Sequence, residues 1–202
     1  EVLFFQSALA LQCFTNEYIY NQNDKETLAI EVLEAEVRES LLRGEQPSPQ
    51  SILCLASYKS LHQYKWSNLI ILTSIIEEVV TRQILEPKQE NLLKSNILVL
   101  QEITNKVSSK VREQYEESPY PRWINMGLSL KPVEFSNETK KLKLKLFDDS
   151  INDIKAPNIL IAGCGTGQQS IAPASKFKNA KVLAVDLSLS SLAYAKRKTE
   201  EL

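Results

Sequence analysis

Histidine and cysteine, which most often bind zinc or act as catalytic base and nucleophile, are scarce in this chain. It has one histidine, His62, and three cysteines, Cys13, Cys54 and Cys164, with no Cys-x-x-Cys pair. The sequence therefore predicts no metal site and no Cys/His catalytic pair. Isolated thiols of this kind suit a reducing compartment, so we expect a cytoplasmic protein.

Long uninterrupted apolar runs and an excess of either charge are also absent. The apolar residues 1–11 are too few to span a bilayer, and Glu77 and Glu78 interrupt the run from Leu69 to Val80. We therefore expect no membrane association. The formal net charge is −1, so a nucleic-acid partner is not indicated either. A hydrophobic content of 43% predicts a globular protein with a real core.

Apolar residues at helical spacing predict an all-helical domain over residues 1–117. We expect helices over about residues 3–20, 24–43, 48–61, 67–85 and 103–117. Asp24, Ser48 and Ser67 are the expected caps of the second, third and fourth helices, and Glu86-Pro87 is expected to end the fourth. No fixed-period repeat is evident, so these helices are expected to pack as a bundle or an accessory cap.

The character of the chain changes at residues 118–123, Ser-Pro-Tyr-Pro-Arg-Trp, where two prolines favour an extended segment. We place a domain boundary there, with the second domain over residues 118–202. Residues 138–147 alternate like a strand, but the preceding Asn137 can cap a helix, and we favour the helix.

The second domain contains a pattern typical of parallel α/β folds. An apolar run over 158–162 predicts a buried strand, the glycine-rich segment 163–167 follows, and 168–176 predict a helix that tolerates Pro173 only near its first turn. A second buried strand is expected over 181–185, ending at Asp186, with a helix over 188–202. Strand, loop, helix, strand, acid and helix form a βαβα unit, so the predicted fold class is α/β with a parallel sheet.

Three glycines and one acid in this unit have the spacing of a site for an adenosine-containing ligand. Gly163, Gly165 and Gly167 let the backbone approach a ligand closely, and Asp186 can accept hydrogen bonds from ribose hydroxyls at the carboxyl edge of the sheet. A dinucleotide fingerprint needs a third glycine where this chain has Gln168, which disfavours NAD.

Residues 159–167, Ile-Leu-Ile-Ala-Gly-Cys-Gly-Thr-Gly, resemble motif I of the class I methyltransferases that use S-adenosylmethionine (SAM), and residues 182–188 resemble motif II. Many members have an acid where this chain has Ala162. Residues 112–123 are similar to a segment that precedes motif I in bacterial methyltransferases attached to tetratricopeptide repeats. The resemblance implies a SAM-dependent methyltransferase with an N-terminal helical domain and the first βαβα portion of a Rossmann-like sheet.

The resemblance also implies roles for particular residues. The loop of Gly163, Cys164, Gly165 and Gly167 is expected to pass under the methionine part of SAM, Asp186 to hold the ribose, and Leu187 to contact the adenine edge. Arg122 either pairs with the SAM carboxylate or forms a structural salt bridge. Tyr115, with Tyr120 and Trp123, either lines the pocket or ties the helical domain to the sheet.

A class I sheet has seven strands and only two are predicted here, so we expect a fragment of a longer enzyme. The catalytic residues and the methyl acceptor are therefore not assigned. The exposed sheet edge could pair with a second copy to form a homodimer. Two alternatives stay open: a non-catalytic helical interaction module with a degenerate nucleotide-binding sheet, and a nicotinamide-dependent oxidoreductase.

Overall fold

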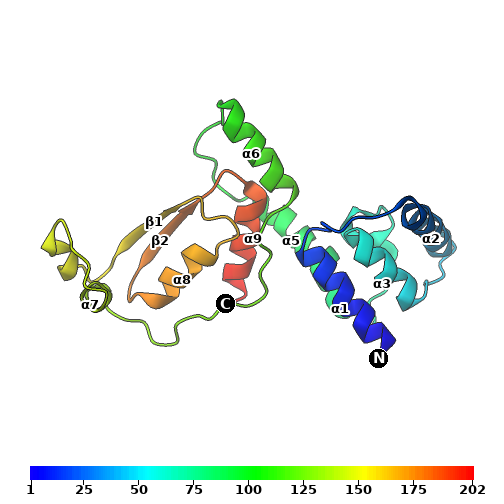
Figure 1. Ribbon diagram of the computed structural model, residues 1–202, viewed down its shortest axis with the longest axis horizontal. Helices are drawn as coiled ribbons and strands as arrows, with labels where there is room; N and C mark the ends of the chain where they lie inside the picture. Colours follow the sequence, from blue (N-terminus) through cyan, green and yellow to red (C-terminus); the bar gives the residue numbers. More distant parts are fainter. The chain divides into compact units, whose positions relative to one another are not determined.

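The computed structural model describes residues 1–202, and the chain divides into two compact units, Glu1–Leu92 and Leu93–Leu202 (Figure 1). The helix that ends just before the Pro-Tyr-Pro segment, α6 (Lys106–Glu117), lies in the second unit. The sequence analysis grouped it with the helical domain. None of the helices in either unit is both long enough and apolar enough to cross a membrane.

The first unit is entirely helical. Its elements are α1 (Val2–Thr15), α2 (Asp24–Leu42), α3 (Pro49–Tyr58), the short 3-10 turns η1 (Leu61–Gln63) and η2 (Ser67–Leu69), α4 (Glu77–Val80), the π-helical turn η3 (Thr81–Leu85) and the start of α5 (Glu86–Lys94). Its buried core is drawn mainly from α1, α2, α3 and α4, with α1 packed along α3 (Figure 1).

Buried Gln83, in the π-helical turn, joins three segments of this core. Its side-chain nitrogen donates to the carbonyl oxygens of Ala10 (3.1 Å) and Ala56 (3.0 Å), and its side-chain oxygen accepts from the Leu61 N–H at 3.1 Å. The amide thus satisfies backbone groups that burial would otherwise leave without partners.

The N-terminal caps of α2 and α3 are set by side chains of the expected types. Ser48 caps α3, where its hydroxyl accepts from the Ser51 N–H at 3.1 Å, as predicted. The predicted cap of α2, Asp24, is wrong by one residue. Asn23 is the cap, and it forms a capping box with Glu26, whose carboxylate accepts from the Asn23 N–H at 3.0 Å.

The predicted fourth helix over residues 67–85 is wrong in its first half. Ser67 begins only a short 3-10 turn, and the chain has no regular helix again until Glu77. Gln46 explains the interruption, because its side chain donates to the Leu69 carbonyl oxygen (3.0 Å) and accepts from the Ile71 N–H (2.9 Å). The β-branched residues that follow add little helix propensity to oppose this.

The prediction that Glu86-Pro87 ends this helix is also wrong. The π-helical turn η3 runs directly into α5, and Pro87 is the second residue of α5. A proline inside continuous helical backbone removes one backbone hydrogen bond and crowds the carbonyl group four residues earlier, which here is that of Gln83 in the wider π-helical turn. The Glu86 N–H donates to the Thr81 carbonyl oxygen, as a π-helical turn requires.

The second unit is a mixed, helix-rich α/β structure with a two-stranded parallel sheet. It contains α6, α7 (Phe135–Lys141), the 3-10 turn η4 (Asp149–Asp153), β1 (Asn158–Ala162), α8 (Gln168–Lys176), β2 (Lys181–Val185) and α9 (Leu189–Glu200). β1 and β2 lie side by side, with Leu160 opposite Leu183 (Figure 1). The predicted strand–helix–strand order and parallel pairing are confirmed.

The expectation that both strands are buried is wrong for this chain. Successive residues of β1, and of β2 as far as Ala184, alternate between exposed and partly covered, and Leu160 and Leu183 are 64% and 63% exposed. Each strand has one neighbour and therefore one open edge, and helices cover only part of the sheet. An apolar run that is typical of a doubly covered strand thus forms a half-exposed one here.

Two helices of this unit differ in detail from the predictions. The helix expected over 138–147 is α7, which starts at Phe135 and ends at Lys141, because Lys143 adopts a left-handed conformation (φ 51°) beyond its C-terminus. In α8, Pro173 is the sixth residue and not part of the first turn. The helix ends three residues later, so the proline interrupts only a short stretch of hydrogen bonding.

Candidate functional site

The glycine-rich loop, residues 163–167, leaves β1 at the carboxyl edge of the sheet and leads into α8. All three glycines have positive φ, namely 72° at Gly163, 52° at Gly165 and 94° at Gly167. Residues with a Cβ rarely adopt this conformation, so the path of the loop depends on glycine. A Cβ on Gly163 or Gly165 would meet no atom within 4 Å, so open space adjoins both positions.

The beginning of the loop is anchored to β2. The Gly163 and Cys164 N–H groups both donate to the Val185 carbonyl oxygen, at 2.8 and 3.1 Å. Cys164 itself is buried, and burial together with the nearby Asp186 charge raises the pKa of its thiol to about 11. The thiol is therefore neutral near pH 7 and unsuited to act as a nucleophile.

Asp186 joins the loop to the end of β2. One of its carboxylate oxygens accepts from the Gly165 N–H at 2.8 Å, and the other accepts from the Ser188 N–H at 2.9 Å. Each carboxylate oxygen can accept two hydrogen bonds, so each retains one unused acceptor position. The carboxylate is thus held rigidly beside the open space at Gly165 with capacity for two further donors.

These features fit the adenosine part of a cofactor such as SAM. A ribose offers two adjacent hydroxyl donors, which match the two remaining acceptor positions of Asp186. The positive-φ glycines place backbone, with no side chain, beside the same space. Leu187, the next residue, is exposed and can cover an apolar ring edge.

The other two predicted site residues lie close to this edge. Tyr115 is in the last turn of α6 and is 41% exposed as a residue, and its carbonyl oxygen accepts from the Ser188 hydroxyl at 3.0 Å. Arg122 is half-buried, with its guanidinium carbon 5.9 Å from the centre of the Tyr194 ring. The structure thus brings Tyr115 of α6 to Ser188, which follows β2, and Arg122 to Tyr194 of α9.

Glu116, which the sequence analysis did not single out, fixes α6 to the start of α9. Its carboxylate accepts from the Ser190 N–H at 3.1 Å and the Ser190 hydroxyl at 2.8 Å, and it lies 3.6 Å from the Lys94 ammonium. Burial by itself would raise the pKa of this carboxyl, but the Ser190 hydrogen bonds and Lys94 outweigh it, so the pKa is lowered. No sequence motif marks this contact.

Trp123 and Thr166 connect the Pro-Tyr-Pro segment to the loop. The indole N–H of Trp123 donates to the Thr166 carbonyl oxygen at 2.9 Å, and the Thr166 hydroxyl donates to the Pro121 carbonyl oxygen at 2.7 Å. Trp123 thus ties its own segment to the glycine loop, a contact within the second unit. Thr166 was not predicted as a site residue, because the sequence motif is defined by the glycines around it.

Comparison with known proteins agrees with the geometry of this edge. Residues 159–202 match a family model described as a methyltransferase domain, and this stretch starts in β1 and contains both the glycine loop and Asp186. The match supports a methyltransferase domain in this part of the chain. No curated protein and no solved structure matched the chain.

Proposed function

We propose that this chain is the cofactor-binding part of a SAM-dependent methyltransferase. The observation that carries the proposal is the Asp186 carboxylate, which is hydrogen-bonded to the Gly165 N–H of a loop of three positive-φ glycines. The family match over residues 159–202 supports the same function independently of the geometry. Similarity of residues 112–123 to the repeat-associated bacterial group would make the parent protein one of its members.

SAM supplies an electrophilic methyl group on a sulfonium, so the protein mainly has to bind and orient the reactants. Asp186 would hold the ribose hydroxyls, the backbone at Gly163 and Gly165 would lie against the methionine part, and Leu187 would cover the adenine edge. Arg122 would pair with the carboxylate of the cofactor, and Tyr115 would border the pocket.

Calorimetric titration of the 202-residue chain with S-adenosylhomocysteine, the product form of the cofactor, tests this proposal. We expect saturable binding with a stoichiometry of one, because the anchored loop and Asp186 are in place before the ligand arrives. NAD serves as the control ligand, and we expect it to give no binding heat, because Gln168 occupies the position of the third dinucleotide glycine. Binding of NAD alone, or of neither ligand, would contradict the proposal.

A further inference from the structure

The segment Pro119–Ile124, which we call the strap, lies against both the glycine loop and α9. Its fifth residue, Trp123, is only 6% exposed although the segment forms no helix or strand. Buried irregular backbone needs hydrogen-bond partners, and the positions of those partners indicate what such a segment does. Every strap contact with the loop described above is made to one residue, Thr166.

The strap and Thr166 are linked in both directions. Trp123 donates to the backbone of Thr166, and the side chain of Thr166 donates to the backbone of Pro121, at 2.9 and 2.7 Å. Thr166 is only 2% exposed. The Trp123–Thr166 hydrogen bond is buried, so losing it leaves a buried polar group without its partner, whereas the Thr166–Pro121 hydrogen bond is partly buried.

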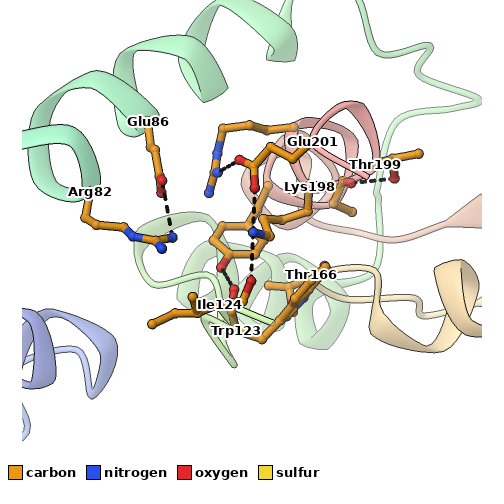
Figure 2. Close-up of polar contacts among 11 residues, drawn as sticks. Arg82, Glu86, Trp123, Ile124, Thr166, Lys198, Thr199 and Glu201 are labelled. Carbon is orange, nitrogen blue, oxygen red and sulfur yellow. Dashed lines mark hydrogen bonds and ion pairs between the residues drawn. The ribbon is translucent and has the colours of Figure 1, made fainter. Parts of the chain in front are cut away.

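α9 holds the strap from the other side. The Tyr194 hydroxyl donates to the Trp123 carbonyl oxygen at 2.5 Å. The Lys198 ammonium donates to the Ile124 carbonyl oxygen at 3.0 Å (Figure 2). The Lys198 ammonium also lies 4.9 Å from the centre of the Trp123 ring and 2.5 Å from the Glu201 carboxylate. These contacts fix both the backbone and the ring of Trp123.

The loop needs such contacts because glycine-rich backbone loses more conformational entropy on ordering than other backbone does. Gly163, Cys164 and Gly165 are fixed by β2 and Asp186, whereas the Thr166 peptide is held by the strap. A loop that is already ordered binds a ligand more tightly, because the ligand does not have to supply the ordering free energy. Trp123, which holds the Thr166 peptide, is therefore in a position to raise cofactor affinity without touching the cofactor.

We propose that Trp123 is a positioning residue for the cofactor loop and acts through Thr166. This inference rests on the proposed function, since it assigns a partner to the loop that would bind SAM. It differs from a purely structural role, in which Trp123 would contribute to the stability of the second unit but not to the affinity for the cofactor.

Three substitutions in the full chain separate the two roles. Trp123→Phe keeps an aromatic ring but removes the N–H that binds the Thr166 carbonyl oxygen. Thr166→Val removes the hydroxyl that binds Pro121, and Thr166→Ser retains it. Phe177→Leu is the matched control, because it removes a ring that packs edge-to-face against Phe135, 5.2 Å away between ring centres, in the same unit but outside the loop.

We expect Trp123→Phe and Thr166→Val each to weaken the binding of S-adenosylhomocysteine by about tenfold, the usual cost of one buried hydrogen bond. Thr166→Ser should bind within about twofold of the unmodified chain, since the hydrogen-bonding group is kept. Phe177→Leu should lower the unfolding midpoint but leave the affinity unchanged. Thermal unfolding of each variant, measured beside the calorimetry, shows whether it is folded.

Tryptophan fluorescence provides a second measurement that does not require a destabilising change at the strap. Trp66 and Trp123 are the two tryptophans, so Trp66→Phe leaves Trp123 as the only reporter. Trp66 lies in the first unit, where its N–H donates to Glu34 at 2.7 Å. We expect the emission of Trp123 to shift on addition of S-adenosylhomocysteine and not on addition of NAD.

The outcomes distinguish this inference from the proposed function. If the unmodified chain does not bind S-adenosylhomocysteine, the proposed function fails and the inference fails with it. If the chain binds but Trp123→Phe and Thr166→Val bind equally well, only the positioning role is overturned. The positioning role is also overturned if Trp123→Phe, like Phe177→Leu, lowers the unfolding midpoint but leaves the affinity unchanged. It is overturned as well if Trp123 emission does not respond to bound ligand.

Discussion

Replacing Asp186 with alanine is expected to weaken the binding of S-adenosylhomocysteine by at least about a hundredfold, because hydrogen bonds to a charged group contribute about 1.5–3 kcal/mol each. Two ribose hydroxyls would lose their acceptor. The Gly165 and Ser188 N–H groups would also lose theirs, so the loop would be less well ordered before binding. Calorimetry of the variant beside the unmodified chain measures the effect.

Two further variants make this result specific. Asp186→Asn retains one acceptor oxygen, so it should lose less affinity than the alanine variant. Asp153→Ala removes an exposed acid of the same unit, outside the loop and the strap, and should bind as the unmodified chain does. Equal affinity of Asp186→Ala and Asp153→Ala would show that Asp186 does not hold the ligand.

Gly167→Ala is expected to have the largest effect on folding. A Cβ at this position would lie 2.6 Å from the Cβ of Ala195, and φ is +94°. The left-handed conformation costs about 1–2 kcal/mol for a residue with a Cβ, and overpacking adds about 1–3 kcal/mol. We expect the free energy of unfolding to fall by about 2–5 kcal/mol, as measured by urea denaturation of the chain.

Gly163→Ala is the informative comparison for this variant. Its φ is also positive, at 72°, but a Cβ there would meet no atom within 4 Å. It should therefore cost only the conformational strain of about 1–2 kcal/mol. If the open space beside Gly163 belongs to the cofactor, this variant should still lose affinity for S-adenosylhomocysteine. A larger loss of stability in Gly163→Ala than in Gly167→Ala would contradict the close packing of Gly167 against Ala195 of α9.

Elements with strong local signals could be predicted from the sequence. β1, α8 and β2 have the predicted bounds, because a short apolar run, a glycine turn and a second apolar run leave few alternatives. The cap at Ser48 was predictable for the same reason, since the hydroxyl and the acceptor geometry are local. The βαβ order and the position of Asp186 at the end of β2 followed directly.

Features that depend on distant partners were not predictable. Gln46 holds the backbone at Leu69 and Ile71 from more than twenty residues away in sequence, so the apparent helix from Ser67 could not be rejected. The contact of Trp123 with Thr166 spans a sequence separation of 43 residues. Strand exposure was also missed, because an apolar run indicates what a strand can bury but not whether anything covers it.

Hydrogen–deuterium exchange of the full chain, with and without S-adenosylhomocysteine, tests the central claim most directly, because it locates the ligand. We expect slower exchange in peptides that cover residues 163–168 and 186–190, and no such change with NAD. Peptides from α2 in the first unit should exchange at the same rate in all three samples. Protection confined to other parts of the chain, or no protection at the glycine loop at saturating ligand, would contradict the assignment of this edge as the cofactor site.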